Sequence, residues 1–371
     1  MFKSIATLAA LVSLALPPVL AQDAPQIDAV DAAIAPLMQA GHFPGIAVAV
    51  LRDGVPVHIG SYGLAQIENE VPVTPHSVFE LASLTKEMTA LAVLTLADQG
   101  QLSLDDHITD YVENAPAAWA DITIDQLLSH MAGLAHRFEA MPNGEFLLNY
   151  STDDMLASAM QTPMVSEPGT DWNYSDQGYF LLGLVIERVT QQSFGAYLQT
   201  QYFEQLGMTQ THMLDQAAIV PHRVEGYAWT DGELQRNRRV WQFGLTSHFG
   251  VTSSLTDMIA WEAELSDPHI IDPEAITATM EIQRPFDAGA NCVSWGYARG
   301  WMAYHFDGHD VVDHGGYSGT AYLRDTTTGI SVVILTNRQD TPDSLSPTAI
   351  AWAVAHAVEP DLPADGPHCW E

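Results

Sequence analysis

Basic residues are scarce in this 371-residue sequence, which has 13 Lys and Arg against 46 Asp and Glu and a formal net charge of -33 at pH 7. Nucleic acids and anionic membrane surfaces are bound through lysine and arginine side chains. We therefore expect neither as a partner. The excess of acid combined with so little lysine also suggests a saline habitat.

Long apolar runs are equally rare, and only the stretch from Ile5 to Leu16, which follows Lys3, stands out. It is too short to cross a bilayer, and the small residue Ala21 follows it at the end of Val19-Leu20-Ala21. This pattern predicts a secretory signal peptide over residues 1–21, with an uncleaved anchor as the alternative. We expect a mature chain of residues 22–371 that is secreted or periplasmic and does not insert into a membrane.

Cysteine occurs only at Cys292 and Cys369. Export permits a disulfide between them, and two unpaired thiols are the alternative. Two cysteines do not make a metal site. His305, His309 and His314 crowd one segment, but its strand-turn-strand pattern would spread them along a hairpin. We expect no metal.

Several fingerprints of other enzyme classes are absent. There is no Walker or dinucleotide-binding motif and no Gly-x-Ser-x-Gly elbow, because Gly316-Tyr-Ser318-Gly319 has its last glycine one residue early. An ordinary α/β-hydrolase and a nucleotide-dependent enzyme are therefore disfavoured. No cofactor is implied.

The patterns that are present predict an α+β fold, with 47% hydrophobic residues, enough for a large core. The expected order is a helix at 27–40, strands at 46–51 and 55–62, mostly helical segments from about 102 to 280, short strands at 296–305, 309–314, 319–324 and 330–336, and a helix at 347–358. We expect an antiparallel sheet with helices on its faces. In this interpretation an α/β lobe comprises residues 22–82 and 285–371, and a mostly helical lobe comprises residues 83–284.

Only one lysine remains once Lys3 is set aside, and it stands in Ser83-Leu-Thr-Lys86 at the start of a helical pattern that runs to Gln99. Residues three apart on a helix share a face, so the amine lies beside the hydroxyl. A serine hydroxyl needs a base to become a nucleophile, and a lysine can serve if its pKa is lowered. Ser83 as nothing more than a helix cap is the alternative.

Two further segments complete a pattern: Tyr174-Ser175-Asp176 and the strand end His314-Gly315-Gly316. With Ser83-x-x-Lys86 they resemble the three motifs of the serine β-lactamase and penicillin-binding protein family. The resemblance is closest to the class C β-lactamase and family VIII esterase branch. It covers roughly Ile27 to Val358 and implies the β-lactamase/transpeptidase-like fold.

The resemblance implies a role for each position. Ser83 would be the acylated nucleophile, Lys86 its proton acceptor, and Tyr174 a second acid/base group that relays the proton to the leaving group. The backbone N–H groups of Ser83 and Tyr317 would form the oxyanion hole. The resemblance further implies that Asp176, His314, Gly315 and Gly316 bind substrate or contact the residues that react with it. As alternatives, Tyr174 is a core aromatic and His314 a structural strand histidine.

Two positions depart from the family pattern. Asp176 replaces the usual asparagine, and a carboxylate near Lys86 would favour its ammonium form; a helix cap is the equal alternative. His314 stands where relatives commonly carry a lysine, and a histidine is largely neutral at pH 7. That difference favours substrates without a carboxylate.

We therefore expect an exported serine hydrolase, a carboxylesterase acting on short-chain esters. The first alternative keeps the chemistry on an amide, as a β-lactamase, D-aminopeptidase or D-alanyl carboxypeptidase. The second is a non-catalytic binding protein on the same fold. In each case the expected partner is a small molecule, and the sequence gives no indication of oligomeric state.

Overall fold

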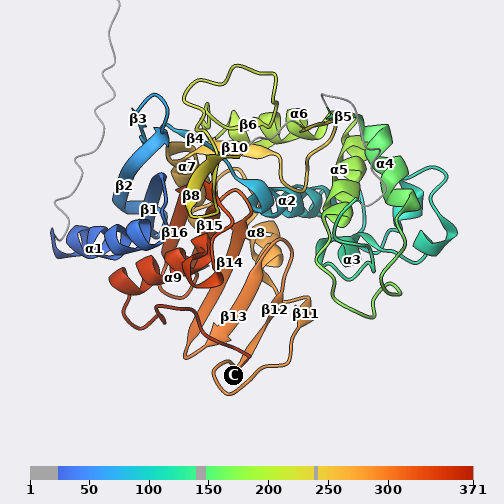
Figure 1. The fold of residues 1–371 in the computed structure, drawn as a ribbon. Coiled ribbons are helices and arrows are strands. Elements are labelled where there is room, and N and C mark those ends of the chain that lie inside the picture. The colour runs from blue at the N-terminus through green and yellow to red at the C-terminus, as the bar shows by residue number, and fades with distance from the viewer. Residues whose placement is uncertain (1–23, 139–147, 238–240, 371) are drawn as a thin grey trace, which may run out of the picture.

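A nine-stranded antiparallel sheet forms the centre of the computed structural model, which describes residues 24–138, 148–237 and 241–370 (Figure 1). The predicted signal peptide lies outside the described residues. In spatial order the strands are β11 (Arg284–Pro285), β12 (Ser294–Tyr297), β13 (Met302–Phe306), β14 (His309–Gly316), β15 (Thr320–Asp325), β16 (Ile330–Thr336), β1 (Gly45–Arg52), β2 (Val55–Gln66) and β3 (Val71–Pro72). Strands from the two ends of the chain thus meet where β16 pairs with β1.

Both faces of the sheet are covered, so β1 is buried along almost its whole length. Successive side chains of a strand point to opposite faces. Ile46, Val48 and Val50 therefore enter one hydrophobic cluster. Ala47 and Ala49 enter the other. The alternation fixes the register of β1 between two cores.

Two helices from the ends of the chain cover the first face, α1 (Ala24–Ala40) and α9 (Pro347–Val358), and they contact each other (Figure 1). Helix α7 (Leu255–Ser266) packs on β1 and β16, and α8 (Pro273–Met280) packs on α2 (Thr85–Asp98). Because α2 carries Lys86, the packing of these helices positions the candidate catalytic residues.

The middle of the chain is a set of helices and small sheets beside the central sheet (Figure 1). The remaining α-helices are α3 (Ile124–Leu128), α4 (Thr152–Gln161), α5 (Asp176–Thr190) and α6 (Phe194–Leu198). Short 3-10 helices are η1 (Ala82–Leu84), η2 (Ile108–Asp110), η3 (Ala117–Trp119) and η5 (Asp343–Leu345), and η4 (Gln199–Phe203) is a π-helical turn. There are three small sheets in the described residues. In the first, β10 (Val251–Ser254) lies between β4 (Val78–Glu80) and β6 (His212–Met213). In the second, β7 (Tyr227–Thr230) lies between β17 (Arg338–Gln339) and β8 (Glu233–Arg236), and in the third β5 (Leu148–Tyr150) pairs with β9 (Trp241–Phe243).

The predicted fold class is confirmed, with two corrections to its elements. The strand expected at 296–305 is two strands, β12 and β13, because Gly300 adopts a φ of 88° in the turn between them. The middle of the chain, expected to be mostly helical, also contains the short strands β5 to β10. The proposed lobe boundaries stay a prediction.

Cys292 and Cys369 form a disulfide, with 5.1 Å between their Cα atoms. It ties the segment before β12 to the C-terminal tail. Of the two alternatives for these cysteines, the structure thus has the disulfide. Across the residues that the structure describes, no helix has both the length and the apolarity to cross a bilayer.

Candidate active site

Ser83 lies in the 3-10 helix η1, which continues directly into α2. Lys86 therefore follows Ser83 by one turn, and its Nζ lies 3.3 Å from the Ser83 Oγ. The preceding residue, Ala82, has a φ of 50°, a left-handed conformation that is strained for a residue with a Cβ. The predicted pairing of hydroxyl and amine is present in the structure.

The Lys86 side chain is fully buried, and its amine has further partners besides the Ser83 hydroxyl. Its Nζ donates to the Asp176 Oδ1 at 2.7 Å and to the His248 carbonyl oxygen at 2.8 Å, and it lies over the Tyr174 ring at 4.8 Å from the centroid. Burial lowers the pKa of Lys86, but the interactions with the Asp176 carboxylate and with Tyr174 outweigh burial and raise this pKa above its usual value. The ammonium form is therefore dominant at neutral pH.

Asp176 is the first residue of α5 and points back to Lys86. The capping alternative for Asp176 is wrong, because the Ser175 hydroxyl takes that position and accepts the Gly178 N–H at 3.1 Å. The second carboxylate oxygen, Oδ2, lies 3.5 Å from the His136 Nε2. Burial would raise the pKa of Asp176, but the Lys86 ammonium and His136 pull it well below its usual range. The Asp176 carboxylate therefore contacts Lys86 through one oxygen and His136 through the other.

Tyr174 lies beside the same amine. Burial raises the pKa of its phenol, although the Lys86 charge and hydrogen bonding with Lys86 and Ser83 act in the opposite direction. The ring packs against His130, with 4.5 Å between centroids, and against His136 at 5.3 Å. Tyr174 is therefore a protonated phenol within reach of the candidate nucleophile and base.

His130 supports the segment that carries Tyr174. Its Nδ1 accepts the backbone N–H of Ser175 at 3.1 Å, so the ring proton resides on Nε2, which lies 3.1 Å from the Tyr297 hydroxyl. Burial and the Lys86 charge lower the pKa of His130 well below its usual value, and the imidazole is neutral. The neutral ring thus binds the backbone next to Tyr174.

His314 and the two glycines end β14 opposite Tyr174, with 6.0 Å between the His314 and Tyr174 rings. The His314 Nδ1 lies 2.8 Å from the Gly315 carbonyl oxygen, which can only accept, so Nδ1 carries the proton and Nε2 has a lone pair. Burial and the nearby Lys86 charge lower the pKa of His314 to about 4. The third motif therefore supplies a neutral group.

Gly316 is required by close packing against η1, because a Cβ there would meet the Leu81 carbonyl oxygen at 2.3 Å. The Thr320 hydroxyl donates to that same oxygen at 2.8 Å. These contacts bring the end of β14 against the segment that carries Ser83. Tyr317, the next residue, is 63% exposed. The structure thus places the backbone of Tyr317 and Ser83 on adjoining segments.

A cavity of about 580 Å³ brings the predicted residues together. Of the predicted site residues, Ser83, Tyr174, Asp176, His314, Gly315 and Tyr317 line it, whereas Lys86 lies beneath its surface and Gly316 packs behind it. Lining residues without a sequence signal are His136, Arg137, Phe138, Leu214, Gln216, Phe243, His248 and Phe249. Aromatic and aliphatic side chains make much of the wall, which suits an apolar acyl or leaving group.

Two histidines near His314 each contact an aspartate. The His309 Nδ1 lies 2.8 Å from the Asp325 Oδ2, and the His305 Nδ1 lies 2.6 Å from the Asp310 Oδ1. Within residues 24–138, 148–237 and 241–370, no group of three or more potential metal ligands converges.

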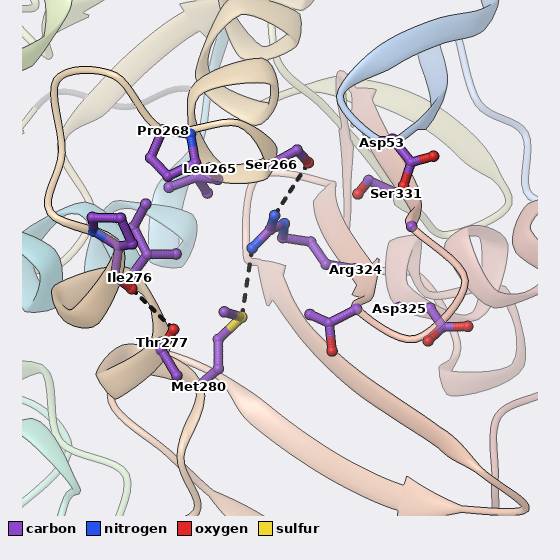
Figure 2. A pocket seen from close by; sticks show the side chains of 13 residues that line it. Asp53, Leu265, Ser266, Pro268, Ile276, Thr277, Met280, Arg324, Asp325 and Ser331 are labelled. Carbon is purple, nitrogen blue, oxygen red and sulfur yellow. Dashed lines mark hydrogen bonds between the residues drawn. The ribbon is translucent and has the colours of Figure 1, made fainter.

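Figure 2 shows a different pocket, of about 290 Å³, between α7, α8 and the C-terminal end of β15. Arg324 points into it toward Ser266 and Met280. The Arg324 Nε donates to the buried Glu262 Oε2 at 2.8 Å. None of the three motifs lines this pocket, and its arginine is bound within a structural ion pair.

Comparison of the sequence with known proteins identifies one family over most of its length. The family model described as Beta-lactamase matches residues 30–357. Protein flp of Staphylococcus aureus (strain N315) is 32% identical over 197 residues, which are 51% of this chain and 39% of that protein. The chain therefore spans well under two thirds of the length of this curated relative.

Solved structures give the same result for the fold. The octameric penicillin-binding protein homologue from Pyrococcus abyssi has a TM-score of 0.77 and 25% identity, covering 90% of this chain and 77% of that chain. EstCE1, described as a hydrolase with promiscuous acyltransferase activity, has a TM-score of 0.75 and 20% identity, covering 90% of this chain and 98% of that chain. At 20% identity, the second likeness shows the fold alone.

Proposed function

This chain belongs to the Beta-lactamase family, and from that premise we propose that it is a serine hydrolase that cleaves short-chain carboxylic esters through an acyl-enzyme at Ser83. The observation that carries the proposal is the contact of Ser83 with Lys86 at 3.3 Å beside Tyr174. A non-catalytic binding protein would not need this arrangement of nucleophile, amine and phenol.

The reaction begins when the Ser83 oxygen attacks the ester carbonyl carbon and its proton passes to the unprotonated amine of Lys86. The tetrahedral oxyanion is stabilised by the backbone N–H groups of Ser83 and Tyr317. As the carbon–oxygen bond breaks, the proton moves from Lys86 through the Tyr174 hydroxyl to the leaving alkoxide. Water then attacks the acyl-enzyme, and the same groups return a proton to Ser83.

Asp176 sets the fraction of Lys86 that is unprotonated and can accept a proton. Because the carboxylate raises the pKa of Lys86, only a small fraction of the enzyme holds the free amine at neutral pH. That fraction grows as the pH rises toward the pKa of Lys86. Activity is therefore expected to increase with pH through the neutral range.

Two features of the cavity favour esters without a carboxylate near the leaving group. His314 is neutral where relatives commonly place a lysine, so no charge from the third motif attracts an anion. Phe138, Phe243 and Phe249 supply apolar surface for a short acyl chain. Amides, including β-lactams and D-aminoacyl amides, are the second candidate because the same Ser83 chemistry cleaves them.

The test is covalent labelling measured by intact mass, once with a fluorophosphonate and once with a β-lactam, together with turnover of ethyl butyrate, a cephalosporin chromogen and a D-aminoacyl amide. The fluorophosphonate should add one adduct to wild type and none to Ser83→Ala, whose ester turnover should fall about 10³-fold or more. Ser103→Ala, at an exposed serine far from the motifs, is the matched control and should behave as wild type. Absence of labelling, or labelling that survives Ser83→Ala, contradicts the nucleophile. Turnover of the amides without the ester favours the second candidate.

We also propose that the chain is exported and cleaved after Ala21. The apolar run after Lys3 and the small residue Ala21 that follows it support this. The mass of the protein recovered from the periplasm or medium of an expressing bacterium should correspond to a chain that begins at Gln22. Retention of the full-length chain in the cell would contradict it.

A further inference from the structure

We call the cavity of about 580 Å³ that Ser83 lines the catalytic cavity. A second hollow, of about 420 Å³, adjoins it. Gln216 lines both spaces, and Tyr317 of the catalytic cavity is followed in the chain by Ser318 of the second hollow. We call this second hollow the side chamber. A substrate group that passes Gln216 leaves the neighbourhood of Ser83 and enters the side chamber.

The side chamber differs from the catalytic cavity in its chemistry. Val224 is the one apolar side chain of its lining, whereas the catalytic cavity has three phenylalanines and a leucine. Two arginines, Arg223 and Arg236, line the side chamber together with Glu80 and Glu225. A polar or charged group of a bound molecule can therefore exchange its hydrogen bonds with water for hydrogen bonds with this lining. An alkyl group would gain no such bonds there.

The two arginines differ in their partners. Arg236 contacts two carboxylates, with 2.6 Å to the Glu225 Oε2 and 3.5 Å to the Glu68 Oε1. The Arg223 Nη2 donates to the backbone carbonyl of Asp215 at 2.7 Å, and within the described parts of the chain Arg223 takes part in no salt bridge. The positive charge of Arg223 thus has no directly bonded carboxylate.

Acidic residues outnumber basic residues in this protein by 46 to 13, yet not every described arginine contacts a carboxylate. Among the described arginines, five contact a carboxylate, namely Arg52, Arg188, Arg236, Arg299 and Arg324. Arg137, Arg223, Arg284 and Arg338 are the described arginines without such a contact, and of these only Arg223 lines the side chamber. A guanidinium binds carboxylates in a fixed, two-pronged geometry. The Arg223 guanidinium can therefore bind the carboxylate of a bound molecule.

The position of the side chamber indicates which part of a substrate enters it. The leaving group must lie near Tyr174, which returns its proton, yet Tyr174, Asp176 and His314 do not line the side chamber. The side chamber is reached instead past Gln216 and Ser318. The acyl chain is therefore the part that extends into it.

We propose that the side chamber binds a terminal carboxylate on the acyl group of the substrate, with Arg223 as the residue that determines this specificity. The substrate class is then the half-esters of dicarboxylic acids. This inference rests on the proposed esterase function and adds the acyl specificity. It complements the neutral His314, because the cation that recognises an anion lies at the acyl end of the cleft.

The test compares two ester series of matched acyl length. The first comprises the monoethyl esters of succinic, glutaric and adipic acid, and the second comprises ethyl butyrate, valerate and hexanoate, with hydrolysis followed by proton release. The measured quantity is the ratio of kcat/KM for the acidic ester to kcat/KM for its neutral counterpart. In wild type this ratio should exceed one for the acid long enough to reach Arg223.

Arg223→Met should lower that ratio about tenfold, which is the loss expected for a hydrogen-bonded charge pair. Arg223→Lys keeps the charge without the fork geometry and should retain part of the preference. Arg137→Met is the matched control, because Arg137 lines the catalytic cavity but not the side chamber. It should leave the ratio near its wild-type value.

Three outcomes overturn the inference: a ratio below one at every length, no change in Arg223→Met with its melting temperature intact, or a fall caused by Arg137→Met instead. If Arg223→Met does not fold, Arg223→Lys carries the test. Turnover of the neutral series alone rejects the side-chamber specificity and leaves the proposed esterase standing. Turnover of neither series rejects both.

Discussion

Lys86 and Asp176 form an ion pair inside the protein, with 2.7 Å between Nζ and Oδ1. Lys86 is fully buried, whereas the Asp176 side chain keeps 26% of its surface exposed. A buried ammonium is tolerated only because it is paired and hydrogen-bonded. The same contact that stabilises Lys86 in the folded protein holds it in the form that cannot accept a proton.

Asp176→Asn should move the activity profile to lower pH. Without the carboxylate, burial and the remaining neighbours set the pKa of Lys86, so this pKa falls and the free amine appears at lower pH. The rise of kcat/KM for ethyl butyrate, measured from pH 5 to 10, should shift down by about one unit or more. Asp105→Asn, at an exposed carboxylate, is the control. Superimposable profiles would remove Asp176 from the control of Lys86.

His314 should make the protein less stable in acid. Its pKa is about 4 in the folded protein because of burial and Lys86, against a reference near 6.5 when unfolded. The unfolded chain therefore binds more protons between these values, and the free energy of unfolding falls as the pH drops from 6.5 to 4, by about 3 kcal/mol for this residue.

Urea unfolding at several pH values between 4 and 6.5 measures this effect. His314→Asn should give a shallower pH dependence than wild type. His222→Asn is the matched control, since His222 is exposed and asparagine tolerates its φ of 61°. Equal slopes for His314→Asn and wild type would contradict the assignment.

His130→Leu should impair both stability and catalysis. It leaves the Ser175 N–H without its acceptor, which costs about 1–3 kcal/mol of unfolding free energy. Loss of the contact with Tyr174 should lower kcat more than it changes KM. His130→Asn suits the left-handed backbone, with its φ of 60°, and restores an acceptor, so partial rescue of kcat identifies a positioning role. A change in KM with kcat left at its wild-type value would argue against a positioning role.

Removing the disulfide should destabilise the protein by about 2–5 kcal/mol, because Cys292 and Cys369 close a long loop of chain. The double variant Cys292→Ser/Cys369→Ser, compared with wild type by urea unfolding, measures this. Wild type in reductant should match the variant. A reductant effect on the variant itself would point to another cause.

Breaking the buried pair between Arg324 and Glu262 should cost about 3–5 kcal/mol of unfolding free energy when one partner is removed. Arg324→Met leaves the fully buried Glu262 carboxylate without its cation. The double variant Arg324→Met/Glu262→Leu should recover part of that loss in a double-mutant cycle. Strictly additive losses would mean that the two side chains do not stabilise each other.

Local chemistry made much of the site predictable. Ser83 and Lys86 are one helical turn apart, so their contact follows from spacing. Tyr174 and His314 were found through motifs in the sequence, and the structure places their rings 6.0 Å apart. The catalytic roles of these residues stay predictions, because geometry alone does not measure reactivity.

The walls of the cleft were not predictable for a physical reason. His248 holds Lys86 through its backbone carbonyl, which every residue possesses, so its identity gives no signal. Gln216 and Phe249 reach the cavity through tertiary packing of loops far apart in sequence. At the start of α5, Ser175 and Asp176 are both good capping residues, and the pull of Lys86 on Asp176 leaves the cap to Ser175.

The burial of Lys86 has a consequence for covalent chemistry. Over residues 24–138, 148–237 and 241–370 it is the single lysine, and none of its surface is exposed. Acylating or crosslinking reagents that target lysine therefore find no side-chain amine on the described surface. Within the described residues, a reagent that modifies a lysine side chain must therefore first enter the cavity lined by Ser83 and reach Lys86 beneath its surface.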